Sequence, residues 1–145
     1  MVRTEDAVVY SRLLEGRFPD YTRVFPPSPL HKIPLNVGKL RAAVDQAAIL
    51  TSEESRGVNF EFGSEELRLT TNAADVGSAD VRLAYAAPIE GLDVALTIDP
   101  RFVGDLLRAE DQEAEIVIEL VDASNAVVFR AGENCTSIIM PLSRG

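Results

Sequence analysis

The pattern of apolar and polar residues predicts two helices. From residue 37 to 51, apolar side chains recur at helical spacing, and Asn36 before them is a residue type that caps helix N-termini. A second helix starts at Asp99-Pro100, because an aspartate cap is followed there by proline at the first helical position. The apolar stripe of this second helix, which is expected to face the protein core, consists of Phe102, Val103, Leu106 and Leu107.

Period-two alternation predicts strands before, between and after the helices. Short turns separate most of these segments, so neighbouring strands are expected to pair as antiparallel hairpins. Gly63-Ser64 marks the clearest hairpin turn. The predicted strands cover residues 6–14, 58–62, 66–71, 79–86, 92–98, 114–121, 126–130 and 135–140.

Two N-terminal segments do not alternate. Residues 16–24 are predicted to form a turn, because Pro19 cannot donate to a ladder and Asp20 favours a turn or one helical turn. Phe18 and Tyr21 then lie one helical turn apart and can pack together. Residues 26–34 are rich in proline and are expected to form an extended, exposed loop with a solvated His31.

The order of these elements indicates an α+β domain in which two helices cover antiparallel sheets. Strand, helix and several strands occur in that order twice, which suggests an internal pseudo-repeat of βαβββ type. The length of 145 residues fits a single domain over 1–145, and a hydrophobic content of 46% supports an ordinary core.

The net charge and the N-terminal sequence argue against tight nucleic-acid binding, export and insertion in a membrane. A formal net charge of −9 argues against tight, independent binding to nucleic acid, which needs a basic face. Residues 1–6 lack the apolar core of a signal peptide, and no apolar run is long enough to cross a membrane. Cys135, the single cysteine, is expected to be a buried strand residue rather than a reactive thiol, in a reducing, cytoplasmic compartment.

The sequence contains no recognisable motif for catalysis, metal binding or phosphate binding. His31 is the only histidine, so Cys/His metal sites are excluded by count and a catalytic triad would need that loop residue. No phosphate-binding glycine motif occurs, and the adjacent acidic pairs fit solvated turns. We therefore expect no cofactor and no catalysis; an enzyme with an unrecognised carboxylate site is the least favoured alternative.

Several motifs, in this order, resemble the bacterial DNA polymerase III beta subunit, the sliding clamp. They are similar to its third, C-terminal domain and span nearly the whole chain. The motifs are Leu14-Glu15-Gly16-Arg17-Phe18-Pro19-Asp20-Tyr21, Ala47-Ala48-Ile49-Leu50 with Glu53, Arg56-Gly57-Val58, Thr71-Asn72 and Met140-Pro141-Leu142.

The resemblance implies a non-catalytic processivity factor for DNA replication. In that family, two chains close head to tail into a ring around duplex DNA, helices line the hole, and the ring tethers the replicative polymerase. An acidic outside can coexist with a mildly basic lining. The implied DNA-facing residues are Lys39, Arg41, Arg101 and Arg108, and Ile49 and Leu50 match the ring joint.

The resemblance also implies a pocket for linear peptides that carry a glutamine followed by aliphatic and aromatic residues. Polymerase and other clamp-binding proteins use such peptides. An apolar concavity with few polar groups at its edge suits them. The residues implied for this domain's share of the pocket are Pro19, Arg23, Val24, Ser124, Ala126, Ile138, Met140, Pro141 and Leu142.

Some features depart from the family. Leu142 is followed by Ser143-Arg144-Gly145 instead of arginine and a terminal aliphatic residue, and residues 72–78 lack the acidic cluster many clamps carry at the joint. The other reading is a stand-alone α+β module that binds proteins or peptides and has no role on DNA. For a fragment with half a pocket and half a joint, we expect a monomer that binds DNA negligibly.

Overall fold

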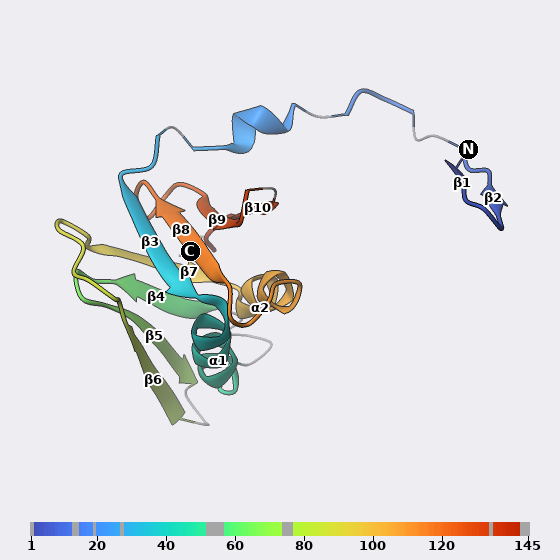
Figure 1. Cartoon of the computed structure of the whole chain (residues 1–145). Coiled ribbons are helices and arrows are strands. Elements are labelled where there is room, and N and C mark those ends of the chain that lie inside the picture. Colours follow the sequence, from blue (N-terminus) through green and yellow to red (C-terminus); the bar gives the residue numbers. More distant parts are fainter. Residues whose placement is uncertain are drawn as a thin grey trace.

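A computed structural model describes residues 2–12, 15–18, 20–26, 28–51, 57–73, 77–133 and 135–142 of the protein. Two four-stranded antiparallel sheets and two helices form its body. The N-terminal residues lead away from this body as an arm, with strands β1 (Val2–Arg3) and β2 (Val8–Val9) at its far end (Figure 1).

The body consists of one unit that occurs twice. The first copy contains β3 (His31–Asn36), α1 (Val37–Ala48), β4 (Val58–Phe62), β5 (Glu66–Ala73) and β6 (Gly77–Ala84). The second contains β7 (Val94–Ile98), α2 (Pro100–Arg108), β8 (Glu115–Leu120), β9 (Val127–Ala131) and β10 (Cys135–Ile139). This order confirms the predicted βαβββ pseudo-repeat.

The two copies exchange their first strands. One sheet has the order β10-β9-β8-β3 and the other the order β6-β5-β4-β7. Thus β3 pairs with β8 of the second copy, with Ile33 opposite Ile118, and β7 pairs with β4 of the first copy, with Phe60 opposite Leu96. Neither sheet is complete without a strand from the other copy, so the two halves form one body.

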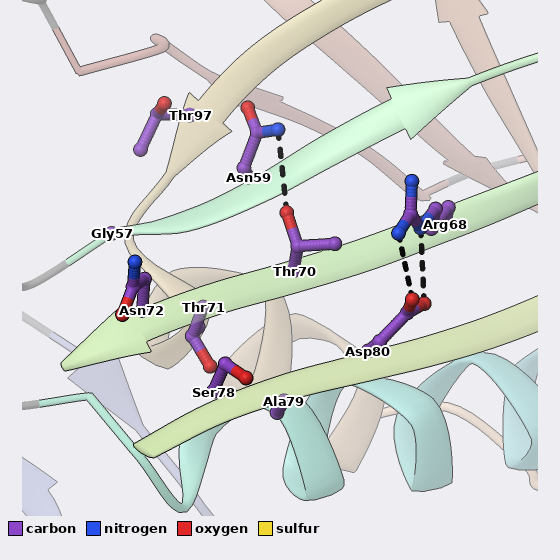
Figure 2. Close-up of a pocket in the computed structure, with 10 residues that line it drawn as sticks. All are labelled: Gly57, Asn59, Arg68, Thr70, Thr71, Asn72, Ser78, Ala79, Asp80 and Thr97. Atoms are coloured by element: carbon purple, nitrogen blue, oxygen red, sulfur yellow. Dashed lines mark hydrogen bonds and ion pairs between the residues drawn. The ribbon is translucent and has the colours of Figure 1, made fainter. Parts of the chain in front are cut away.

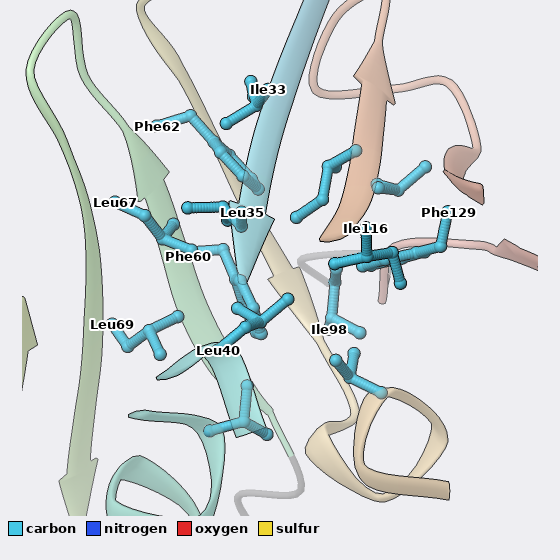
Figure 3. Close-up of a cluster of buried hydrophobic side chains, with 14 of the residues drawn as sticks. Ile33, Leu35, Leu40, Phe60, Phe62, Leu67, Leu69, Ile98, Ile116 and Phe129 are labelled. Atoms are coloured by element: carbon cyan, nitrogen blue, oxygen red, sulfur yellow. The ribbon is translucent and has the colours of Figure 1, made fainter. Parts of the chain in front are cut away.

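The core lies between the two sheets and is closed by the helices (Figure 3). As the alternation predicts, every second side chain of a strand points into this core. Phe60 and Phe62 of β4 are an example, and their rings stack with centroids 6.2 Å apart. The largest fully buried side chains are Phe60, Phe62, Phe129, Ile33, Leu40, Leu67, Leu69, Ile98, Leu107, Ile116, Ile118 and Leu120.

Both helices begin where their caps predict. The Asn36 side chain accepts a hydrogen bond from the Lys39 N–H at 2.9 Å, and that of Asp99 accepts one from the Arg101 N–H at 3.0 Å. Helix α1 ends at Ala48, earlier than the predicted residue 51. It contacts β5, β6 and α2, and α2 also contacts β10, so the two helices lie beside each other (Figure 1).

Two N-terminal predictions were wrong in part. The predicted loop 26–34 gives way to β3 at His31, and His31 is half-buried rather than solvated. An edge strand tolerates Pro34, because only one of its sides is paired. The predicted strand 6–14 shrinks to Val8–Val9, paired with Val2–Arg3; Leu13 and Leu14 lie outside the described residues.

The turn prediction for residues 16–24 is confirmed where the structure describes it. Asp20 caps a 3-10 helix, η1 (Tyr21–Val24), and the rings of Phe18 and Tyr21 pack edge to face with centroids 6.4 Å apart. None of the described helices is long and apolar enough to cross a membrane.

Candidate functional site

The C-terminal residues close a hollow of about 480 Å³, which we call the tail hollow. Its walls are Ala95, Leu96 and Thr97 of β7, the turn residues Ala123 and Ser124, and Met140, Pro141 and Leu142. The Leu142 N–H donates to the Thr97 carbonyl at 2.8 Å, so the segment after β10 runs along the edge of β7. The tail hollow therefore brings together four of the predicted pocket residues: Ser124, Met140, Pro141 and Leu142.

A second, more apolar hollow of about 370 Å³ lies between α2 and β10; we call it the helix hollow. Phe102 and Leu106 form one side, and Ser137, Ile138 and Ile139 the other. Met140 lines both hollows and is 59% exposed. The predicted residues Ile138 and Met140 thus meet here, and Met140 stands where the two hollows adjoin.

Phe102 was misassigned from the sequence and is the main lining residue that the pattern missed. It was expected to face the core, yet it is 58% exposed, whereas Val103 and Leu107 are fully buried. The four apolar residues spread over roughly 140° around the helix axis, and Phe102 and Leu106 occupy the side away from the fully buried Val103 and Leu107. That side faces the helix hollow, and the width of the stripe is the signal that could have found it.

The rim of the tail hollow is held by a carboxylate in the turn before β9. Asp122 accepts hydrogen bonds from the Ser124 N–H at 2.7 Å and the Asn125 N–H at 3.0 Å. The bond from the Ser124 amide first, and then that from the Asn125 side chain at 2.9 Å, lower the pKa of Asp122. The turn therefore presents Ser124 in a fixed position beside an ionised group.

The remaining pocket candidates lie elsewhere in the structure. Arg23 and Val24 belong to η1 on the arm, and neither of them lines the tail hollow or the helix hollow. The Arg23 guanidinium pairs with Asp20 at 3.2 Å, and Val24 is 52% exposed. Ala126 is buried, and Pro19 lies outside the described residues.

The four candidate DNA-facing cations sit on the adjoining helices α1 and α2. Three of them pair with an acid of the same helix or its cap: Arg41 with Asp45 at 3.7 Å, Arg101 with Asp99 at 2.5 Å, and Arg108 with Asp105 at 2.6 Å. Lys39 is exposed and forms no ion pair with any residue that the structure describes. The net positive field over these helices is therefore weak.

The candidate joint residues follow the last turn of α1. Ile49 is 76% exposed and Leu50 is half-buried. The Thr71 hydroxyl, which is buried, donates to the Ala47 carbonyl at 3.2 Å and so ties this end of α1 to β5. Ile49 is thus an exposed apolar side chain just beyond a helix end that is anchored to the sheet.

A third hollow, of about 480 Å³, lies on the polar side of the sheet β6-β5-β4-β7 (Figure 2). Arg68 binds both carboxylate oxygens of Asp80, at 3.0 and 2.7 Å, and this guanidinium lowers the pKa of Asp80 to about 2. Asn59 donates to the Thr70 hydroxyl at 3.4 Å. These polar groups pair across neighbouring strands, so they brace the sheet.

Cys135 is exposed, which corrects the expectation of a buried strand residue. It begins β10, the edge strand of its sheet, at the end where the first two residues of the strand are both exposed. A hydrogen bond with the Glu110 side chain raises the pKa of the thiol and so disfavours the reactive thiolate. Among the described residues, no group of three or more His, Cys, Asp or Glu side chains could hold a metal ion.

Comparison with known proteins identifies the family. The family model described as "DNA polymerase III beta subunit, C-terminal domain" matches residues 22–143. The chain belongs to this family. The beta sliding clamp of Salmonella typhimurium is 30% identical over 139 residues, and that of Staphylococcus epidermidis is 27% identical over 135 residues.

Solved clamp structures share the fold. The DNA polymerase III beta subunit of Thermotoga maritima superposes with a TM-score of 0.82 at 26% identity, covering 92% of this chain and 36% of that one. The sliding clamp of Bartonella birtlesii, solved bound to griselimycin, gives 0.81 at 27% identity with the same two coverages. The match to the Salmonella clamp covers 94% of this chain and 37% of that clamp, and the match to the Staphylococcus clamp covers 91% and 35%. The chain therefore spans a little over a third of the length of these relatives.

Proposed function

We propose that the chain acts as the C-terminal segment of a bacterial sliding clamp, a non-catalytic ring component that surrounds duplex DNA in the cytoplasm and tethers the replicative polymerase. The observation that carries this proposal is the interlocked βαβββ pair, with α1 and α2 side by side across both sheets. Family membership over residues 22–143 supports it.

In this proposal α1 and α2 face the DNA. Their arginines are already paired with Asp45, Asp99 and Asp105, so few charges are available to release counterions from phosphates. Weak attraction is what a sliding component needs, because a closed ring is retained by its shape. The chain alone is then a monomer that binds duplex DNA negligibly at physiological salt.

The exposed Ile49 and the adjacent Leu50 supply this chain's side of the ring joint. In the assembled protein they would meet the first domain of a second copy in a head-to-tail dimer. A side chain that is 76% exposed gains free energy by burial in such a contact, and it contributes little to the fold of the chain alone.

The tail hollow and the helix hollow form the peptide site. Met140 adjoins both, so aliphatic and aromatic side chains of one extended peptide can occupy them together. The Ser124 hydroxyl, on a turn that Asp122 holds in place, is the polar partner at the rim for a glutamine amide. Pro19, Arg23 and Val24 of the arm, and the buried Ala126, remain predictions for this site.

The test is a titration of the chain with a labelled peptide containing glutamine followed by aliphatic and aromatic residues, read by fluorescence anisotropy. Replacing Met140 and Leu142 together by alanine should weaken binding at least about fivefold, since both side chains line the tail hollow. Leu30→Ala is the matched control, because Leu30 is 72% exposed and lines neither hollow. Equal affinities of the double variant and the control would refute the site.

A further inference from the structure

Gly57, immediately before β4, lies where three segments of the chain meet. A Cβ at this position would overlap the methyl group of Thr97 on β7, and it would lie 3.2 Å from Cδ1 of Leu142. Gly57 is not among the glycines with positive φ, so its backbone is open to any residue. The requirement for glycine here is therefore one of space.

Thr97 connects this contact to the tail hollow. Its side chain fills the space over Gly57, and its carbonyl accepts the hydrogen bond of the Leu142 N–H at 2.8 Å (Figure 2 shows Gly57 and Thr97 at the ends of neighbouring strands). Leu142 is 40% exposed and lines the hollow. The position of β7 relative to Gly57 thus sets the position of the hollow's C-terminal wall.

We propose that Gly57 is a positioning residue for the peptide site. Because it has no side chain, Thr97 and Leu142 pack over the start of β4, and this packing holds the segment 140–142 against the edge of β7. This inference rests on the proposed function in one respect, namely that the tail hollow binds peptide. It assigns a role to a glycine that contributes no atom to the tail hollow's lining.

The first test is Gly57→Ala in the whole chain, read by hydrogen exchange of the Leu142 amide in NMR. An extra methyl group in a packed site forces its neighbours to shift, so exchange at Leu142 should become about tenfold faster. Peptide affinity should fall by a similar factor. Gly104→Ala in α2 is the matched control: the nearest atom to its Cβ would be 3.9 Å away, and neither quantity should change.

The second test is rescue. Thr97→Ser removes the overlapping methyl group and keeps the carbonyl that binds Leu142. The double variant Gly57→Ala/Thr97→Ser should recover the Leu142 protection and the affinity of Thr97→Ser alone. If Gly57→Ala fails to fold, recovery of folding in the double variant supports the same conclusion.

The outcomes separate the two proposals. Unchanged Leu142 exchange in Gly57→Ala, or no recovery in the double variant, overturns the positioning role. If the wild-type chain binds no peptide while the exchange and rescue results hold, the positioning of the tail stands and the proposed peptide site is wrong.

Discussion

Truncation of Phe102 tests the helix hollow directly. A phenylalanine side chain presents roughly 200 Å², and the 58% exposure of Phe102 leaves more than half of it open to a ligand. If a bound peptide covers half of the open part, it removes roughly 60 Å² from water, worth about 1.5 kcal/mol at about 25 cal/mol per Å². Phe102→Ala should therefore weaken peptide binding about tenfold.

The fold should tolerate this change. The buried part of the ring, roughly 80 Å², limits the loss of unfolding free energy to about 2 kcal/mol. A domain of ordinary stability, about 5–15 kcal/mol, stays folded after such a loss. Circular dichroism at 25 °C and chemical denaturation would establish this before binding is measured.

The assay is a titration with the glutamine-containing peptide, followed by amide chemical shifts in NMR. Ile49→Ala serves as the control, since Ile49 is exposed and lines neither hollow. The wild-type chain and the control should show shifts at Ser137, Ile138 and Ile139 on addition of peptide. An affinity of folded Phe102→Ala within twofold of the control would show that Phe102 does not contact the peptide.

Three further predictions concern the fold and the joint. Arg68 lowers the pKa of folded Asp80 to about 2, so the stabilising effect of this carboxylate is present above about pH 4 and is lost as the pH falls toward 2. The unfolding free energies of wild type and Asp80→Asn should therefore converge over that range. A constant difference between them would contradict the pairing. Leu107→Ala, at a fully buried position, should lower the unfolding free energy by about 3 kcal/mol in urea titrations, and a loss below about 1 kcal/mol would show that the site is not core. Leu50→Lys in a clamp whose C-terminal domain is this chain should shift sedimentation from dimer to monomer, whereas an unchanged dimer would count against the joint.

Local signals were sufficient for the helices and for most of the strands. Asn36 and Asp99 cap α1 and α2 with their own side chains, so the helix starts depend on residues next to them in sequence. The strand Val58–Phe62 is buried at every second residue, as its alternation predicts. Hence the α+β class, both helices and the strands after each helix could be predicted from the sequence, whereas the first strand of the first βαβββ unit, β3, was missed.

What failed depends on partners distant in sequence. The segment 31–36 becomes a strand because β8, more than eighty residues further on, pairs with it despite Pro34. Among the described residues of the predicted strand 6–14, Val8 and Val9 form a strand, and it pairs with Val2–Arg3 and not with a strand of the two large sheets. Cys135 is exposed at the start of the edge strand β10, and strand order is not visible in a local pattern.

The candidate site was predictable only in part for the same reason. Met140, Pro141 and Leu142 line one hollow because the tail bonds to Thr97, a contact across more than forty residues. Phe102 enters the site because α2 lies against β10. The arm residues Arg23 and Val24 came from the family resemblance, and they line neither hollow in this chain.

The most direct test of the ring assignment is topological. Residues 22–142 would replace the corresponding C-terminal domain of the Salmonella typhimurium clamp, and the purified chimera would be loaded onto a labelled nicked circular DNA. A closed ring should stay on the circle through gel filtration at physiological salt and should be lost when a single cut makes the DNA linear. Retention on the linear DNA, or equal loss from both forms, would contradict the ring assignment.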